Sequence, residues 1–142
     1  MDQDNLEKFK FLIGDWNLEY RIPKSIFSDP GTDTGVGSFK RILKDKYVVF
    51  EYSTKSGGEA KGIFAWDDKI KMFRYWWFEN SGSYLSATCN FINDVTLAMN
   101  WHDTLLVQTF TKETAERVIL KMQHPAEKGE YELVLEVILT KR

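Results

Sequence analysis

The sequence predicts an all-β fold, a closed antiparallel meander barrel of about ten strands with a short N-terminal helix. From Gly14 onward, apolar and polar residues alternate with the period of two that is typical of strands. Turn-forming residues interrupt this alternation at intervals of roughly 8–12 residues, as in a meander. No second helix of useful length follows, which argues against helix-grip and cystatin-like folds. An uncovered sheet must close on itself or split into a sandwich.

The short helix is predicted from the first fourteen residues. Asp4 and Glu7 have the spacing of a capping box, with Asp4 as N-cap. Leu6, Phe9 and Ile13 then recur at helical spacing, and Gly14 ends the pattern as a C-terminal glycine does.

The first strand follows directly, with Trp16, Leu18, Tyr20 and Ile22 alternating with polar residues. Residues 23–35 are rich in proline and glycine and are predicted to form the longest loop.

The last two strands have the clearest pattern of one wet and one dry face, which is the antiparallel signature. Val118, Leu120 and Met122 share one face of the first. In the second, the same face is predicted to carry every other residue from Tyr131 to Leu139, namely Tyr131, Leu133, Leu135, Val137 and Leu139.

Length and composition limit the classes of protein to consider. The 142 residues fit one domain, 1–142, long enough to fold without a disulfide or metal. The net charge is −2 and no basic stripe is present, so nucleic acid is not expected as a partner. Cys89 is the single cysteine, and no signal peptide or membrane span is visible. We therefore expect a soluble, cytoplasmic protein.

The segment Phe11-Leu12-Ile13-Gly14-Asp15-Trp16 resembles the opening of calycin barrels such as lipocalins. The resemblance implies that the helix plugs one end of the barrel and that Gly14 and Trp16 form its floor. In lipocalins a basic residue from the last strand covers this tryptophan. Lys141 and Arg142, which follow the last predicted strand here, are therefore the expected cations.

The whole chain is most similar to the uncharacterised lipocalin-like family DUF1579. Trp66-Asp67-Asp68 resembles the aromatic-Asp turn that members have in the middle of the chain. Where members commonly have Gly-Gly before the third strand, this chain has Leu43-Lys44-Asp45-Lys46. The resemblance implies no established activity.

The densest candidate site is the aromatic segment 72–78. Arg74, Trp76 and Phe78 share one face of the predicted strand, and Phe73, Tyr75 and Trp77 share the other. If the first face lines the interior, its rings suit an apolar tail and Arg74 suits a carboxylate. Alternatively, Arg74 points to solvent, which is the usual position of an arginine.

The following strand leaves the same choice open. Tyr84, Ser86, Thr88 and Asn90 alternate with Leu85, Ala87, Cys89 and Phe91. The polar set is either exterior or the polar lining of a cavity, and Tyr84 and Thr88 are its candidate ligand-binding members.

Other residues suggest less chemistry. Cys89 is expected to be a buried, inert thiol, and Glu51 to face water because Val48, Phe50 and Tyr52 alternate with it. Asp67 and Asp68 fit a structural turn. The sequence has no P-loop, His-Glu-x-x-His, Cys-x-x-Cys or Gly-x-Ser-x-Gly motif, so it predicts no catalytic residue, metal site or cofactor.

Three functions remain open at this point. The first is a barrel that binds a small apolar or amphiphilic molecule in its interior, since a ten-stranded barrel is wide to fill. The second is a haem-binding, nitrobindin-like barrel that uses His102 or His124. The third is a module that forms a homodimer through exposed Phe73, Tyr75 and Trp77.

Overall fold

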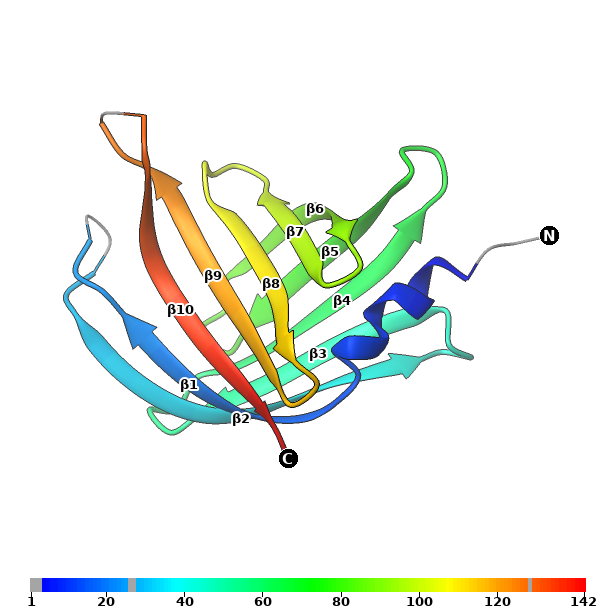
Figure 1. Ribbon diagram of the computed structural model, residues 1–142, viewed down its shortest axis with the longest axis horizontal. Coiled ribbons are helices and arrows are strands. Elements are labelled where there is room, and N and C mark those ends of the chain that lie inside the picture. The colour runs from blue at the N-terminus through cyan, green and yellow to red at the C-terminus, as the bar shows by residue number, and fades with distance from the viewer. Residues whose placement is uncertain (1–3, 26–27, 128) are drawn as a thin grey trace.

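A computed structural model describes residues 4–25, 28–127 and 129–142. Ten antiparallel strands form a closed barrel in which each strand pairs with its neighbours in the chain. The first strand pairs with the last and completes the ring (Figure 1). The predicted fold class is therefore confirmed. The strands are β1 (Gly14–Ile22), β2 (Gly31–Ile42), β3 (Tyr47–Thr54), β4 (Glu59–Asp67), β5 (Met72–Glu79), β6 (Tyr84–Asn93), β7 (Thr96–Trp101), β8 (Val107–Thr114), β9 (Arg117–Pro125) and β10 (Tyr131–Lys141).

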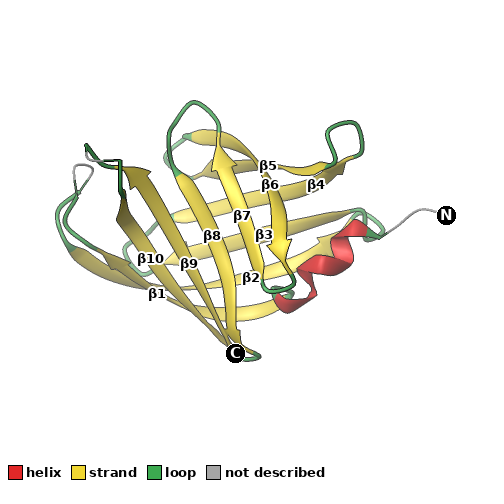
Figure 2. Ribbon diagram, turned by 45° about the horizontal axis from the view of Figure 1, so that its top comes forward, coloured by secondary structure: helices red, strands yellow, loops and turns green. Residues whose placement is uncertain are grey.

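The N-terminal helix η1 (Asn5–Phe11) is a 3₁₀ helix that lies at one end of the barrel (Figure 2). Leu6 and Phe9 are its buried residues, and Leu12 at its C-cap is buried as well, so the intervals of three match three residues per turn. Leu12 therefore takes the inward position that α-helical spacing predicted for Ile13. Among the described residues, no helix combines the length and apolarity that crossing a membrane requires.

The predicted capping box does not form. The Asp4 side chain caps no backbone N–H and instead accepts two hydrogen bonds from the Arg41 guanidinium, at 3.0 and 2.9 Å. An arginine fork satisfies both carboxylate oxygens, which one backbone N–H cannot do. The Glu7 amide donates to the Asp4 carbonyl oxygen at 3.1 Å.

The loop predicted over residues 23–35 is shorter, because β2 already begins at Gly31. Residues 26 and 27 of that prediction lie outside the described residues. The glycines belong to the strand for a steric reason. A Cβ atom at Gly35 would lie 2.2 Å from the Ser53 carbonyl oxygen of β3, so only glycine allows this approach.

The turn between β2 and β3 has an unusual backbone. Leu43, Lys44 and Asp45 have φ angles of 52°, 58° and 62°, in the left-handed region that favours glycine. Arg41 donates to the Asp45 carbonyl oxygen at 2.6 Å and so holds the turn. This is the position where the DUF1579 pattern has Gly-Gly.

The last strand is interrupted by a bulge between Leu133 and Leu135. Beyond the bulge Leu135, Val137 and Leu139 line the barrel interior, as predicted. Tyr131 is exposed and Leu133 lies at the outer surface, so the prediction that they share this face was wrong. The extra residue of a bulge shifts the alternation by one, and the sequence pattern did not reveal it.

The barrel floor forms at the η1 end. Trp16 is fully buried, and its indole N–H donates to the Leu12 carbonyl oxygen at 2.7 Å. Gly14, with φ of +136°, lets the chain turn from η1 into β1. The Lys141 Nζ lies 5.3 Å from the Trp16 ring centroid, so Lys141 is the covering cation. Arg142 is not: its backbone N–H donates to the Asp15 carbonyl oxygen and its side chain lies on the outer face.

Candidate functional site

A cavity of about 290 Å³ lies inside the half of the barrel that faces away from η1. Its wall comes from eight of the ten strands and from the loop that precedes β8. The lining side chains are apolar or aromatic with one amide, and none of these described residues is charged. They are Leu18, Tyr20, Phe50, Tyr52, Tyr75, Trp77, Leu85, Trp101, Leu106, Gln108, Leu120, Met122, Leu135, Val137 and Leu139.

Packed rings explain why the other half of the barrel is filled. Phe9 of η1 contacts Phe64 with ring centroids 4.8 Å apart, and Phe64 contacts Tyr75 at 4.2 Å. Tyr75 in turn contacts Trp101 at 5.7 Å, where the cavity begins. A continuous column of rings thus joins the plug to the cavity floor and makes that floor rigid.

Two polar groups in the cavity wall receive indole hydrogen bonds. The Trp77 indole N–H donates to the Tyr52 hydroxyl at 3.0 Å, and the Trp101 indole N–H donates to the Gln108 side-chain oxygen at 3.1 Å. Burial raises the pKa values of the Tyr20 and Tyr52 hydroxyls. These phenols therefore stay protonated at neutral pH and keep an O–H group to donate.

The face of β5 that carries Arg74, Trp76 and Phe78 points outward, which is the second of the two alternatives left open by the sequence. Trp76 is 40% and Phe78 49% exposed, and the Arg74 Nε donates to the Asp67 carboxylate at 2.6 Å outside the barrel. Phe73, Tyr75 and Trp77 occupy the inner face instead. Both faces of this segment are aromatic, so alternation alone could not choose between them.

Tyr84 and Thr88 lie on the same outer face, because β6 pairs them with Phe78 and Arg74. Leu85, Ala87 and Cys89 take the inner positions. The five predicted ligand-binding residues therefore do meet on one surface, but that surface is outside the cavity. That they bind a ligand stays a prediction.

The predicted dimer surface is also corrected. Phe73 and Tyr75 are buried and Trp77 is half-buried, all toward the interior, so they cannot contact a second copy. On β5 and β6 the exposed rings are Trp76, Phe78 and Tyr84, the last two with centroids 6.4 Å apart. A homodimer stays a prediction, now for this outer face.

Neither histidine is among the described residues that line the cavity. The His102 Nδ1 lies 2.9 Å from the hydroxyl of Ser86, a residue on the outer face of β6 opposite Trp76. The His124 Nδ1 lies 2.8 Å from the Pro125 carbonyl oxygen at the end of β9. The geometry therefore gives the haem hypothesis no ligand directed into the cavity.

The remaining candidates have structural positions. Cys89 is fully buried, and burial raises the pKa of its thiol, which makes it a poor nucleophile. Glu51 faces water, as expected, and it pairs with Lys61 at 3.5 Å. No group of three metal-ligating side chains is found in the described part of the chain.

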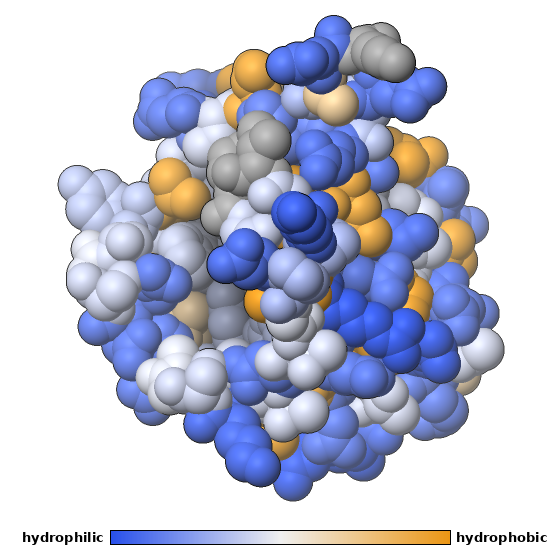
Figure 3. All heavy atoms as spheres, turned by 90° about the vertical axis from the view of Figure 1, so that its left-hand side faces the viewer, coloured by the Kyte–Doolittle hydropathy of each residue, from blue (hydrophilic) through white to orange (hydrophobic). Residues whose placement is uncertain are grey.

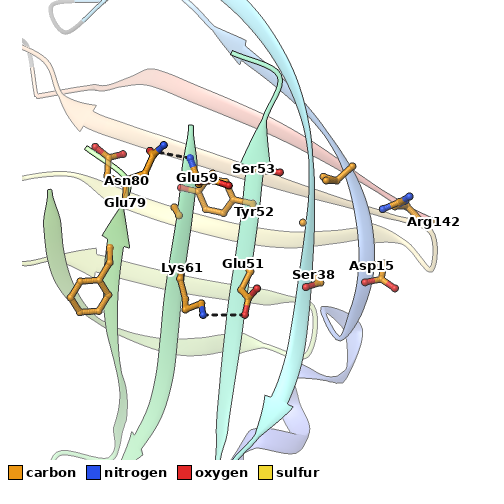
Figure 4. Close-up of a pocket in the computed structure, with 14 residues that line it drawn as sticks. Asp15, Ser38, Glu51, Tyr52, Ser53, Glu59, Lys61, Glu79, Asn80 and Arg142 are labelled. Atoms are coloured by element: carbon orange, nitrogen blue, oxygen red, sulfur yellow. Dashed lines mark hydrogen bonds and ion pairs between the residues drawn. The ribbon is translucent and has the colours of Figure 1, made fainter. Parts of the chain in front are cut away.

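A wider depression of about 540 Å³ lies outside the barrel across β1 to β5 (Figure 4). The side chains of Glu51 and Lys61 lie side by side on neighbouring strands, and the Glu59 backbone N–H donates to Asn80 at 3.1 Å. The depression is open to solvent, and its Glu51 and Lys61 side chains are exposed. It therefore offers less enclosure to a ligand than the interior cavity does.

The face that carries the β1–β2 and β9–β10 loops is largely hydrophilic, with hydrophobic residues in smaller patches among them (Figure 3). Two carboxylates lie on this side of the cavity. Asp33 stands opposite Tyr20 in the β1–β2 register, and Glu79 follows Trp77 on the same face of β5. Each is close enough for its negative charge to add to the rise in the pKa of a cavity phenol, Asp33 at Tyr20 and Glu79 at Tyr52.

Comparison with known proteins supports the fold. No protein-family model matches the sequence, and no curated protein resembles it significantly. The crystal structure of Rv2717c from M. tuberculosis is similar over 97% of both chains, with a TM-score of 0.66 and 12% identity. A de novo designed fluorescence-activating β-barrel is similar over 94% of this chain and 95% of its own, with a TM-score of 0.48 and 10% identity. At these identities, the likeness to Rv2717c shows a shared barrel fold.

Sequence reasoning placed several cavity-lining residues on inner faces, among them Tyr52, Met122 and Leu135, but named none of them as a ligand-binding residue. Gln108 is the clearest omission, since it alternates in phase with the buried Phe110 and is itself only 6% exposed. The signal that could have identified Gln108 is a polar residue at a strand position that alternation assigns to the apolar, inner face.

Proposed function

We propose that the protein binds a small, mainly apolar molecule inside the barrel. The supporting observation is the 290 Å³ cavity, whose lining is apolar and aromatic except for the Gln108 amide and the tyrosine hydroxyls. This volume is near the lower end of the range for ligand sites, about 300–1,000 Å³. This small volume favours a compact ligand over a long-chain lipid.

The proposal changes the expected role of charge. An anionic amphiphile was a candidate ligand because Arg74, if it lined the interior, could pair with the carboxylate of the ligand. Arg74 is instead paired with Asp67 on the outer surface. An uncharged ligand suits this cavity better, because burying an unpaired charge costs far more than burying an apolar group.

A pair of tryptophan substitutions on neighbouring residues of β9 tests this proposal. Met122 lines the cavity and Lys121 faces solvent. Met122→Trp should fill the cavity and weaken binding of the uncharged fluorescent probe N-phenyl-1-naphthylamine at least tenfold, whereas Lys121→Trp should leave it unchanged. Fluorescence titration measures both. Equal binding by the wild-type protein and Met122→Trp would place the probe elsewhere and contradict an interior site.

We further propose that the chain belongs to the lipocalin-like DUF1579 family and is cytoplasmic. The support for the family is the order of η1, Gly14, Trp16 and the Trp66-Asp67-Asp68 turn along the barrel. The support for the location is a single cysteine, buried and without a disulfide.

A further inference from the structure

The Gln108 side chain has a fixed orientation in the cavity wall. Its oxygen accepts from the Trp101 indole at 3.1 Å, and an indole N–H can only donate. The amide therefore cannot be turned the other way without losing this bond, and its nitrogen must point away from Trp101. Within the described chain, no hydrogen bond from that nitrogen is found.

This nitrogen is a donor without a partner on a buried side chain. Gln108 is only 6% exposed, and it is one of the residues that line the cavity. Among the described residues, the fully buried side-chain atom without a partner is Arg41 Nε, so the Gln108 nitrogen keeps some surface open to the cavity. A ligand acceptor placed there would gain an ordinary hydrogen bond, worth roughly 0.5–1.5 kcal/mol.

The other polar groups of the wall favour the same ligand. The Tyr52 hydroxyl already accepts from Trp77, so its proton is available to donate. The carboxylates of Asp33, opposite Tyr20, and of Glu79, two residues beyond Trp77, lie near the phenols but are not part of the cavity lining. An anionic ligand would meet their negative charge with no described cation among the cavity-lining residues.

We propose that the cavity selects an uncharged, mainly apolar molecule that carries a hydrogen-bond acceptor such as a carbonyl oxygen, which the Gln108 amide nitrogen binds. This inference rests on the proposed function and names the chemical class of its ligand. Gln108 acts as the specificity-determining residue, and the surrounding rings and aliphatic side chains bind the apolar part.

Three probes of similar size and shape test the proposal: acetophenone, ethylbenzene and benzoate. On the same ring, acetophenone carries a neutral acceptor, ethylbenzene carries no acceptor and benzoate carries an anion. Titration calorimetry on the wild-type protein, Gln108→Leu and Gln108→Glu gives nine affinities. Gln108→Glu retains an acceptor for Trp101 but, because burial favours the protonated carboxyl, it lacks a donor only once it ionises at high pH. Its titrations are therefore made at pH 9, where it controls for the loss of that internal bond.

Acetophenone should lose about fivefold in affinity relative to ethylbenzene in both variants, the value of one ordinary hydrogen bond. Benzoate should bind more weakly than acetophenone to the wild-type protein. In wild-type protein, the NMR signals of the Gln108 side-chain amide should shift with acetophenone and less with ethylbenzene. This measurement decides the question even if a variant fails to fold.

The outcomes separate the two proposals. Suppose that ethylbenzene binds but the substitutions leave the ratio of acetophenone affinity to ethylbenzene affinity unchanged, or that benzoate binds best. The inference about the acceptor is then wrong, and interior binding stands. If none of the three probes binds wild-type protein at millimolar concentration, the proposed function fails and the inference fails with it.

Discussion

Gly62 of β4 shows how a single residue shapes the cavity floor. A Cβ atom at this position would lie 1.8 Å from the Tyr75 hydroxyl and 2.2 Å from its ring. Tyr75 is buried against this gap and contacts both Phe64 and Trp101. The missing side chain of Gly62 therefore makes room for the ring that separates the packed half of the barrel from the hollow half.

Gly62→Ala should destabilise the protein by about 1–3 kcal/mol, the usual cost of overpacking a core. Tyr75 must move toward the cavity, so probe binding should weaken as well. Gly31→Ala is the matched control, because a Cβ atom there meets nothing within 4 Å. Urea unfolding of both variants measures the difference. Equal stability would mean that the ring has another position of similar energy.

Sequence reasoning identified single residues well where one physical demand dominates. Trp16 and Val48 are inside and Glu51 is outside, as their alternation predicts. The 72–78 segment has large rings on both faces, and hydrophobicity therefore carries no information about which face is inner. The inner face of this segment is fixed by the neighbouring strand β4, which places Gly62 opposite Trp77.

At the scale of elements, Arg41 joins η1 to the barrel. It bonds both oxygens of Asp4 before the helix and the carbonyl oxygen of Asp45 in the β2–β3 turn. The hydrogen bonds from Arg41 lower the pKa of Asp4 below its ordinary value of 3.8. The contact therefore stabilises the folded state above that value and is lost as the pH falls through the lowered pKa.

Asp4→Asn should reduce the stability at pH 7 by less than about 1 kcal/mol, because the pair is partly exposed to water. The difference from wild-type protein should shrink as the pH falls well below 3.8. Unfolding in urea across this range measures it. Asp94→Asn, in the exposed β6–β7 turn, serves as a control with no expected change at pH 7. A constant deficit of Asp4→Asn at every pH would show that Asn fails for a reason other than charge.

Elements were predictable where periodicity is long. The strand number and the plug follow from repeated alternation and from one helical segment. Two features depend on tertiary contacts that no local pattern contains, namely the bulge after Leu133 and the glycines within β2. The 3₁₀ form of η1 could not be predicted from the local pattern either, because a short segment fits the period of a 3₁₀ helix as well as that of an α-helix.

For the molecule as a whole, the ring-packed half should be more resistant to local opening than the hollow half. Phe64 and Ala60 lie on the same strand, the first packed on Phe9 and the second toward the mouth. Amide hydrogen exchange should be slower at Phe64 than at Ala60. A bound ligand should slow exchange mainly at the mouth end. Uniform protection along β4 would contradict this division.

The pairing of β1 with β10 also governs how the chain reaches this state. Trp16 lies opposite Lys141, so the contact joins residues at nearly opposite ends of the described chain. During synthesis on the ribosome the sheet has two unpaired edges until the last strand emerges, because the order of the barrel follows the order of the chain. Such edges pair readily with other chains. The moment of greatest risk for this protein is therefore the interval before its final strand is made, when nine strands are present and none can yet close the ring.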